Sequence, residues 1–431
     1  MAMPTKPLAT HVPGTGGKGK YLFPFILITS LFFLWGFAHN LDPILIPHLK
    51  KSFTLSNVQS TLVDTAVFFA YFLMAIPAGM IMKKYGYKTG IIFGLLLFAL
   101  GSFLFIPAAN TQQYDFFLVA LFIIACGLTI LETAANPYAT LLGSPDKATQ
   151  RLNFCQSFNG LAAALAPVVG ARIILTKGYS ETELTSMTEA ARKLALASEA
   201  SSVKMPYLIL GCILVLVAVF FAITKLPKIQ GSTEAGASKN ILQTFRHRHL
   251  SWGVAAQFFY VGAQVSVFSL FIIYAPISAG VNQIQAADYL GICGIAFLIG
   301  RFLGTFLMKY ILPERLLAGY AAINVLLCIV AMMAHGMITI YAVIGICFFM
   351  SIMFPTIFSL GIKNLGGDTE YGSSLIIMSI VGGAILPRIF AFIGDTVGNF
   401  QYGYIVPLVC FIVILVFGIK GYKVIALKPI N

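Results

Sequence analysis

Twelve apolar runs of helix length recur along this chain of 431 residues, and they constrain its fold more than any other feature. A helix of about 20 apolar residues spans a bilayer, because in lipid every backbone N–H and C=O must be bonded within the chain. The sequence therefore predicts an all-α integral membrane protein with twelve transmembrane helices. They lie near residues 22–48, 57–82, 90–109, 115–142, 152–176, 205–225, 250–277, 287–309, 316–335, 338–362, 373–398 and 402–424.

The composition excludes an ordinary soluble domain, because 58% of the residues are hydrophobic and only 10% are charged. In a soluble protein, a net charge of +13 would favour nucleic acid as a partner. Here most Lys and Arg fall in loops on one side of the predicted helices, as the positive-inside rule requires, so we expect no nucleic-acid partner. The seven cysteines lie in apolar stretches without CxxC spacing, so we expect neither a metal site nor a disulfide. No cofactor is expected either.

The runs divide into six and six around a polar, basic gap, "KLPKIQGSTEAGASKNILQTFRHRH". The sequence predicts two six-helix bundles, residues 22–225 and 250–424, joined by a cytoplasmic linker over 226–249. Residues 1–21 and 425–431 are predicted to be cytoplasmic tails, because the loop charges place both termini inside. The first tail also lacks the apolar core and the cleavage site of a signal peptide.

The two halves echo each other at "GMIMKKYGYK", which begins at Gly79, and "GTFLMKY", which begins at Gly304. Two six-helix halves resemble the major facilitator superfamily, in which substrate binds near the midplane between the halves. The loop signature of that superfamily is only partly kept. Three residues match it (Gly79, Gly86 and Lys88) and three depart from it (Lys83, Lys84 and Tyr87).

Three carboxylates fall well inside predicted spans, namely Asp42, Asp64 and Glu132. A charged group at mid-bilayer costs about 2.5–3.5 kcal/mol on insertion scales, so each should face the bundle interior or an aqueous cavity. The alternative is a neutral carboxyl that is hydrogen-bonded between helices and has no part in transport.

Amides and aromatic rings accompany these acids on several spans. Asn136 lies one turn after Glu132 on the same face, just before Pro137, which predicts a kink. Such side chains can bind sugar hydroxyls and stack on a pyranose, although amides in membranes also join helices. Arg301 is the exception, and we expect it to form a salt bridge or to contact helix ends. The other polar stripes are Asn153, Gln156 and Asn159 on span 5, Gln257, Tyr260 and Gln264 on span 7, and His39, Asn40 and Asp42 on span 1.

From Pro24 to the end of span 12 the chain closely resembles the L-fucose/proton symporter family and its hexose-transporting relatives. The resemblance is carried by "SLFFLWGF", "LETAANP", "AQFFYVGAQ", "GRFLGTFL" and "PTIFSLGIKNLGGDTEYGSS". It implies a facilitator-fold symporter of the bacterial inner membrane that imports a monosaccharide with a proton by alternating access. The family's span 4 acid corresponds to Glu132, and its sugar-contacting amides correspond to Asn40, Gln156 and Asn159.

Four positions depart from the family pattern. The family's span 1 acid falls on Pro43, which makes the preceding Asp42 the candidate for that role. Asp64 stands where the family has Gln, Phe354 where it has a site Tyr, and Phe268 where it has Trp. The sugar therefore stays open among L-fucose, glucose, galactose and mannose.

The predicted site combines the helical spacing of the polar residues with the family resemblance. The coupling ion is the proton, and sodium held by oxygens of Asp42 and Asp64 is the alternative. A transporter-like sugar sensor is a further alternative, whereas an enzyme is not expected, because no nucleotide loop or nucleophile motif occurs. We expect a monomer in the bilayer with a sugar as its partner. The proton-coupling candidates are Glu132, Asp42 and Asp64, and the substrate-binding candidates are Asn40, Glu132, Asn136, Gln156, Asn159, Gln257, Tyr260, Gln264 and Phe354.

Overall fold

The computed structural model describes residues 22–40, 62–111, 113–174, 186–189, 191–192, 194–195, 201, 203–227 and 241–425. Within these residues the regular structure is helical and no strand occurs. The predicted all-α fold is confirmed. The tail 1–21, most of the linker 226–249 and all but the first residue of the tail 425–431 lie outside the described residues, so the domain boundaries stay predictions.

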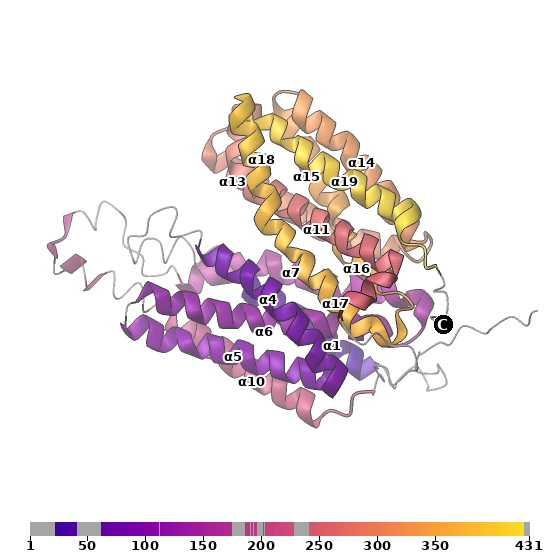
Figure 1. The fold of residues 1–431 in the computed structure, drawn as a ribbon. Coiled ribbons are helices and arrows are strands. Elements are labelled where there is room, and N and C mark those ends of the chain that lie inside the picture. Colours follow the sequence, from indigo (N-terminus) through magenta and orange to yellow (C-terminus); the bar gives the residue numbers. More distant parts are fainter. Residues whose placement is uncertain are drawn as a thin grey trace, which may run out of the picture.

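The first half of the chain forms one bundle, drawn in indigo to magenta in Figure 1. Its long helices occupy the first six predicted spans, and α5 packs against both α6 and α10. A positive-φ glycine, Gly86 at φ 83°, makes the turn between α4 and α5 without the strain that a side chain would bring. The helices are α1 (Leu22–His39), α4 (Leu62–Tyr85), α5 (Tyr87–Thr111), α6 (Tyr114–Leu141), α7 (Ala148–Ile174) and α10 (Lys204–Ile223).

The second half forms the other bundle, in which three predicted spans are broken into two helices each. Helices α11 and α12 bend by 60° at Leu270, α15 and α16 meet at Ser351, and the turn η4 (Ser379–Val381) joins α17 to α18. The bounds are α11 (Arg248–Ser269), α12 (Phe271–Ala279), α13 (Gln283–Leu307), α14 (Pro313–Met333), α15 (Met337–Met350), α16 (Met353–Gly361), α17 (Thr369–Met378), α18 (Gly382–Val397) and α19 (Ile405–Val416).

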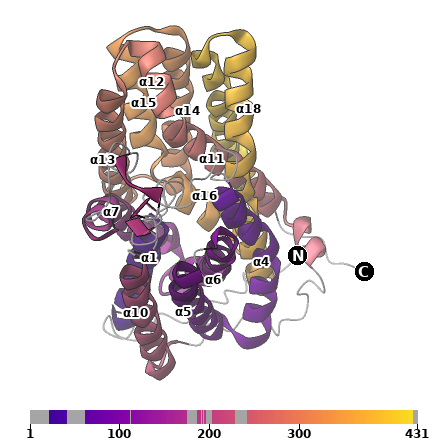
Figure 2. The ribbon, with the colours of Figure 1, turned by 90° about the vertical axis from the view of Figure 1, so that its left-hand side faces the viewer.

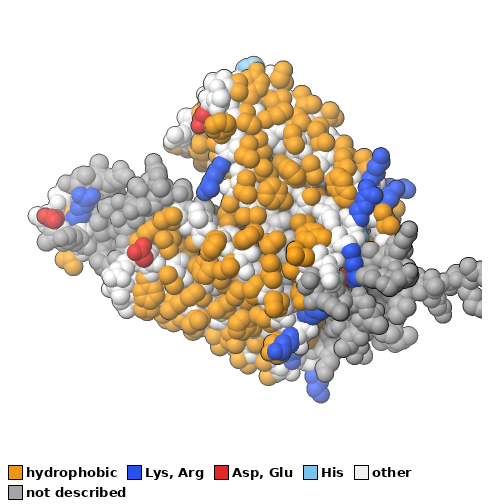
Figure 3. Space-filling view, in the orientation of Figure 1, with side chains coloured by type: hydrophobic (Ala, Val, Ile, Leu, Met, Phe, Trp, Pro, Cys, Tyr) orange, Lys and Arg blue, Asp and Glu red, His pale blue; other side chains and the backbone are white. Residues whose placement is uncertain are grey.

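The described helices agree with a membrane-spanning fold. Ten segments are long and apolar enough to cross a bilayer, and the bent pair α11 and α12 makes an eleventh. Helix α7 coincides with the remaining predicted span, but its polar residues, including Gln150, Arg151 and Asn153, lower its hydropathy. Apolar side chains cover most of the visible surface, and most of the visible Lys and Arg lie towards one end of the helices (Figure 3).

The two bundles touch at the end of the helices that carries the linker, here called the linker side. Ser373 Oγ on α17 donates to Thr133 O on α6 at 2.8 Å, and the hydroxyls of Thr149 and Ser359 lie 2.9 Å apart. A Cβ on Gly79 of α4 would overlap Ser374 Oγ of α17, so these two helices are in close contact. Helix α7 lies beside α13 of the other bundle, as Figure 2 shows from the side.

Candidate functional site

Glu132 lies on α6 with 9% of its surface exposed, so its carboxyl is buried in the bundle. The hydroxyl of Tyr71, on α4, donates to Glu132 Oε1 at 2.8 Å. Among the described residues no Lys, Arg or His forms an ion pair with this carboxyl. Burial without a cation favours the neutral form of a carboxyl, which is a form that can donate a hydrogen bond.

A pair of amides lies one helical turn from Glu132. Gln156 Nε2 on α7 donates to Asn136 Oδ1 on α6 at 3.2 Å, so the two helices face each other here. Asn136 is fully buried, and its Nδ2 has no partner in the described part of the chain. A buried donor without a partner costs free energy, so this group is available to a ligand.

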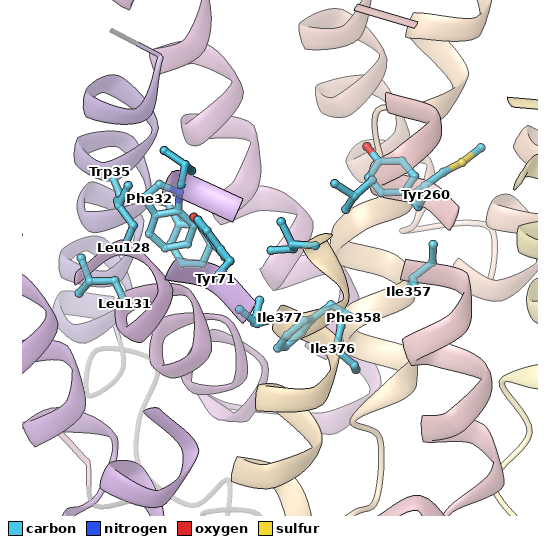
Figure 4. Packing of buried hydrophobic residues seen from close by; sticks show 14 of the residues in the cluster. Phe32, Trp35, Tyr71, Leu128, Leu131, Tyr260, Ile357, Phe358, Ile376 and Ile377 are labelled. Carbon is cyan, nitrogen blue, oxygen red and sulfur yellow. The ribbon is translucent and has the colours of Figure 1, made fainter. Parts of the chain in front are cut away.

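The other two amides of the first bundle contact α1. Asn159 Nδ2 donates to Phe32 O at 3.3 Å, and Asn40 Nδ2 donates to Gly36 O of its own helix at 2.7 Å. Gly36 makes room for this packing, because a Cβ there would lie 2.6 Å from Asn159 Nδ2. The interior beside these amides is aromatic, and Figure 4 places Phe32, Trp35 and Tyr71 together on this side.

The second bundle contributes Gln257 and Tyr260 from one face of α11. Gln257 is 0% exposed, and within the described residues neither its Oε1 nor its Nε2 has a hydrogen-bond partner. The ring of Tyr260 meets the ring of Phe354, on α16, edge to face at 6.2 Å. Gln264 follows Gln257 by about two turns of α11 and is half-buried.

Two of the predicted residues cannot be placed. Asp42 lies outside the described residues, and the backbone of Asp64 is described in α4 but its side chain is not. Their parts in coupling stay predictions. In the described part of the chain no group of three His, Cys, Asp or Glu side chains is close enough to hold a metal ion.

Sequence reasoning missed Tyr71, the hydrogen-bond partner of Glu132, and it also missed that Glu370 is buried. Tyr71 follows Asp64 by two helical turns on the same face of α4, and that spacing was the available signal. Glu370 lies in the first turn of α17 and is 1% exposed, whereas the span was predicted to start only at residue 373. Asn153 was expected to share a face with Gln156 and Asn159. Its Nδ2 donates to Thr149 O and to Thr356 Oγ1 of the other bundle, so this amide joins the two bundles. Its Oδ1 has no hydrogen-bond partner among the described residues.

Arg301 fulfils the expectation that it contacts a helix end. Its Nε donates at 2.8 Å to the carbonyl of Ser351, which caps the C-terminus of α15. Its Nη1 donates at 2.9 Å to Gln156 O of the first bundle.

Comparisons with known proteins agree with this architecture. Residues 25–374 match the Major Facilitator Superfamily. The chain is 44% identical to the L-fucose-proton symporter of Escherichia coli (strain K12), over 93% of this chain and 94% of that one. It is 39% identical to the glucose/galactose transporter of Brucella abortus (biovar 1, strain 9-941), over 98% and 99% of the two chains.

Among solved structures, the fold superposes on the crystal structure of the Major Facilitator Superfamily transporter FucP in the outward conformation. The TM-score is 0.87 at 44% identity, over 92% of this chain and 98% of that chain. A second structure, of FucP carrying the substitution N162A, also gives 0.87, at 43% identity over the same shares of the two chains. The chain is therefore a membrane transporter of the Major Facilitator Superfamily and belongs to its family of bacterial L-fucose-proton symporters and glucose/galactose transporters.

Proposed function

We propose that this protein imports a monosaccharide together with a proton by alternating access. The sugar is L-fucose or a related hexose such as glucose, galactose or mannose, in keeping with the names of the relatives. The membrane is the bacterial inner membrane, and the protein acts as a monomer with both termini in the cytoplasm. The gathering of Lys and Arg on the linker side supports this orientation.

The observation that carries the proposal is a buried carboxyl beside unfilled amide groups. Among the described residues Glu132 has a hydrogen bond from Tyr71 but no cation beside it, and Asn136 Nδ2, one turn away, has no partner. Gln257 offers a further free donor and acceptor from the second bundle. Amides and a carboxyl bind hydroxyls in pairs, whereas a charged ligand would call for fixed opposite charges.

The proposed coupling uses the two states of Glu132. A neutral carboxyl can donate to a sugar hydroxyl, and an ionised one can only accept. Proton and sugar therefore favour each other's binding, which is the reciprocal coupling that a symporter requires. The neutral form can also cross between the two cavity states without leaving an unpaired charge in the membrane.

Alternating access follows from the way the bundles meet. The cross-bundle bonds between Thr149 and Ser359, and between Ser373 and Thr133, lie on the linker side. With that side in the cytoplasm, this is a state closed to the cytoplasm, in keeping with the outward conformation of the FucP structure. Rocking of the bundles would break these contacts and open the site inwards.

The proposal is tested by uptake into proteoliposomes of a panel of labelled sugars, each with a proton gradient, a sodium gradient or neither. We expect one or more of L-fucose, glucose, galactose and mannose to accumulate only with the proton gradient. Accumulation on the sodium gradient alone would reject proton coupling and make Asp42 and Asp64 the coupling candidates. Accumulation of none of the sugars would reject sugar transport.

A further inference from the structure

Arg301 is a buried cation in the membrane part of the protein, and the proposed sugar binding and proton coupling give it no role. It lies on α13 with 4% of its surface exposed. Among the described residues no Asp or Glu forms an ion pair with it. A buried, unpaired charge is costly, so its position calls for an explanation.

Part of the explanation lies within the second bundle. Arg301 Nε donates to the carbonyl of Ser351, the C-cap residue of α15. Backbone carbonyls at the end of a helix have no helical partner, and the helix dipole there favours a cation. The ring of Phe297, one turn earlier on α13, lies 4.5 Å from the guanidinium carbon. Both contacts belong to one bundle, so they can persist when the bundles move.

The remaining contact crosses to the first bundle. Arg301 Nη1 donates to Gln156 O. The side chain of Gln156 in turn donates to Asn136, which lies one turn from Glu132. Gly160, one turn after Gln156, lies against the guanidinium, because a Cβ there would be in ordinary contact with Nη1 at 3.6 Å. A hydrogen bond from a charged donor is about twice as strong as a neutral one. The other cross-bundle hydrogen bonds described above have neutral donors.

We propose that Arg301 is a positioning residue for transport that holds α7 against the second bundle while the linker side is closed. Its bond to Gln156 O has to break when the bundles rock, whereas its bond to Ser351 O is kept. Because Gln156 also contacts Asn136, the release of α7 moves an amide of the sugar site. This inference rests on the proposed function for its meaning, but its test does not depend on which sugar is carried.

The test measures the separation of the bundles on the linker side by electron paramagnetic resonance between two spin labels. The labels are placed by Lys147→Cys and Lys309→Cys, at exposed positions next to α7 and α13, and Cys212, which is exposed, is replaced by Ser. These helix ends are close in the closed state, since Gln150 Nε2 donates to Thr305 O at 3.1 Å. The purified full-length protein is measured without sugar.

Two variants remove the cross-bundle bond by different routes. Arg301→Lys keeps the charge but loses the planar fork that reaches two carbonyls. Gly160→Leu keeps Arg301 and displaces its guanidinium by bulk. The matched controls are Gly160→Ala, whose Cβ would make only ordinary contacts of 3.4 Å or more, and Arg315→Lys at an exposed arginine of α14.

We expect Arg301→Lys and Gly160→Leu to add a population with a longer label separation, while both controls keep the parent distribution. The ratio of closed to open protein should fall on the order of tenfold, equivalent to about 1.4 kcal/mol at 25 °C. Parent-like distances in both variants would overturn the proposal. If Arg301→Lys does not fold, the comparison of Gly160→Leu with Gly160→Ala decides. Sugar uptake that fails across the panel would reject the proposed function and leave this measurement valid.

Discussion

At the scale of the residue, Gln257 and Asn153 differ in whether their side-chain amide nitrogen is hydrogen-bonded within the described part of the protein. Both are fully buried amides in the membrane part of the protein. Asn153 Nδ2 donates to Thr149 O and to Thr356 Oγ1, whereas Gln257 has a partner for neither of its polar atoms among the described residues. An unsatisfied buried amide costs free energy in the empty protein, and the cost is recovered only if a ligand binds it.

Gln257→Leu should therefore weaken sugar binding without destabilising the protein. The loss of one hydrogen bond to the sugar lowers affinity up to about tenfold, at roughly 0.5–1.5 kcal/mol. Asn153→Leu, the matched control, should lower the melting temperature, because it leaves Thr356 without its amide partner. The measurements are thermal melting and equilibrium sugar binding of both variants. A Gln257→Leu protein that melts earlier and binds sugar normally would assign Gln257 to the fold.

At the scale of the element, close packing of α1 against α7 positions the amides of the first bundle. A Cβ on Gly36 would lie 2.6 Å from Asn159 Nδ2 and 2.9 Å from Asn159 O. One of these atoms is the backbone oxygen of Asn159, so α1 and α7 would have to move apart to admit a methyl group. Glycine at this position thus keeps Asn159 beside α1.

We expect Gly36→Ala to destabilise the protein by about 1–3 kcal/mol, the usual cost of overpacking, and to lower sugar binding with it. Gly291→Ala is the matched control, because it adds the same methyl group to α13 where no atom lies within 4 Å. Thermal melting and sugar binding of the two variants are compared. Equal melting temperatures would show that α1 and α7 are not held at this distance by Gly36.

The elements also show what could be predicted from sequence. Apolar length alone placed the spans, because a helix that faces lipid must be apolar over its whole crossing. The break between α15 and α16 was not predicted, although Pro355 has no N–H to donate to the carbonyl of Ser351, four residues earlier, and its ring disfavours a continuous helix there. The carbonyl of Ser351 instead bonds to Arg301, fifty residues earlier in the chain. The start of α17 at Thr369 was missed because polar residues there pack against α4 and α6.

Helical spacing predicted part of the candidate site. It placed Glu132 and Asn136 on one face of α6, and Gln156 of α7 does reach Asn136. It could not tell Asn153, which bonds across the bundles, from Asn159, which bonds to α1. Partners on other helices decide these roles, and they become known only when the helices are packed. The assignment of all these residues to sugar binding stays a prediction.

At the scale of the whole molecule, the orientation in the membrane can be tested with a matched pair on α13. Asn282 and Lys309 are both exposed and lie just beyond opposite ends of this helix. In the Cys212→Ser background, we expect an impermeant thiol reagent to label Asn282→Cys in right-side-out vesicles and Lys309→Cys in inverted ones, because basic loops stay inside. The reverse labelling would place the linker side outside and contradict the proposed direction of import.

The whole account depends on Glu132 as the group that carries the proton and also binds the sugar. Glu132→Gln keeps the shape of the neutral carboxyl and can still donate to a sugar hydroxyl, but it cannot release a proton. Sugar binding and exchange down a sugar gradient should therefore remain. Uphill accumulation, which takes its energy from the proton gradient, should be lost.

Equilibrium exchange set beside proton-driven accumulation, in proteoliposomes of the wild type, Glu132→Gln and Glu132→Ala, tests this claim most directly. Our account predicts that Glu132→Gln exchanges sugar but does not concentrate it, while Glu132→Ala also binds sugar more weakly, since the hydrogen bond is gone. Accumulation by Glu132→Gln on a proton gradient would contradict the account and transfer the coupling role to Asp42 or Asp64.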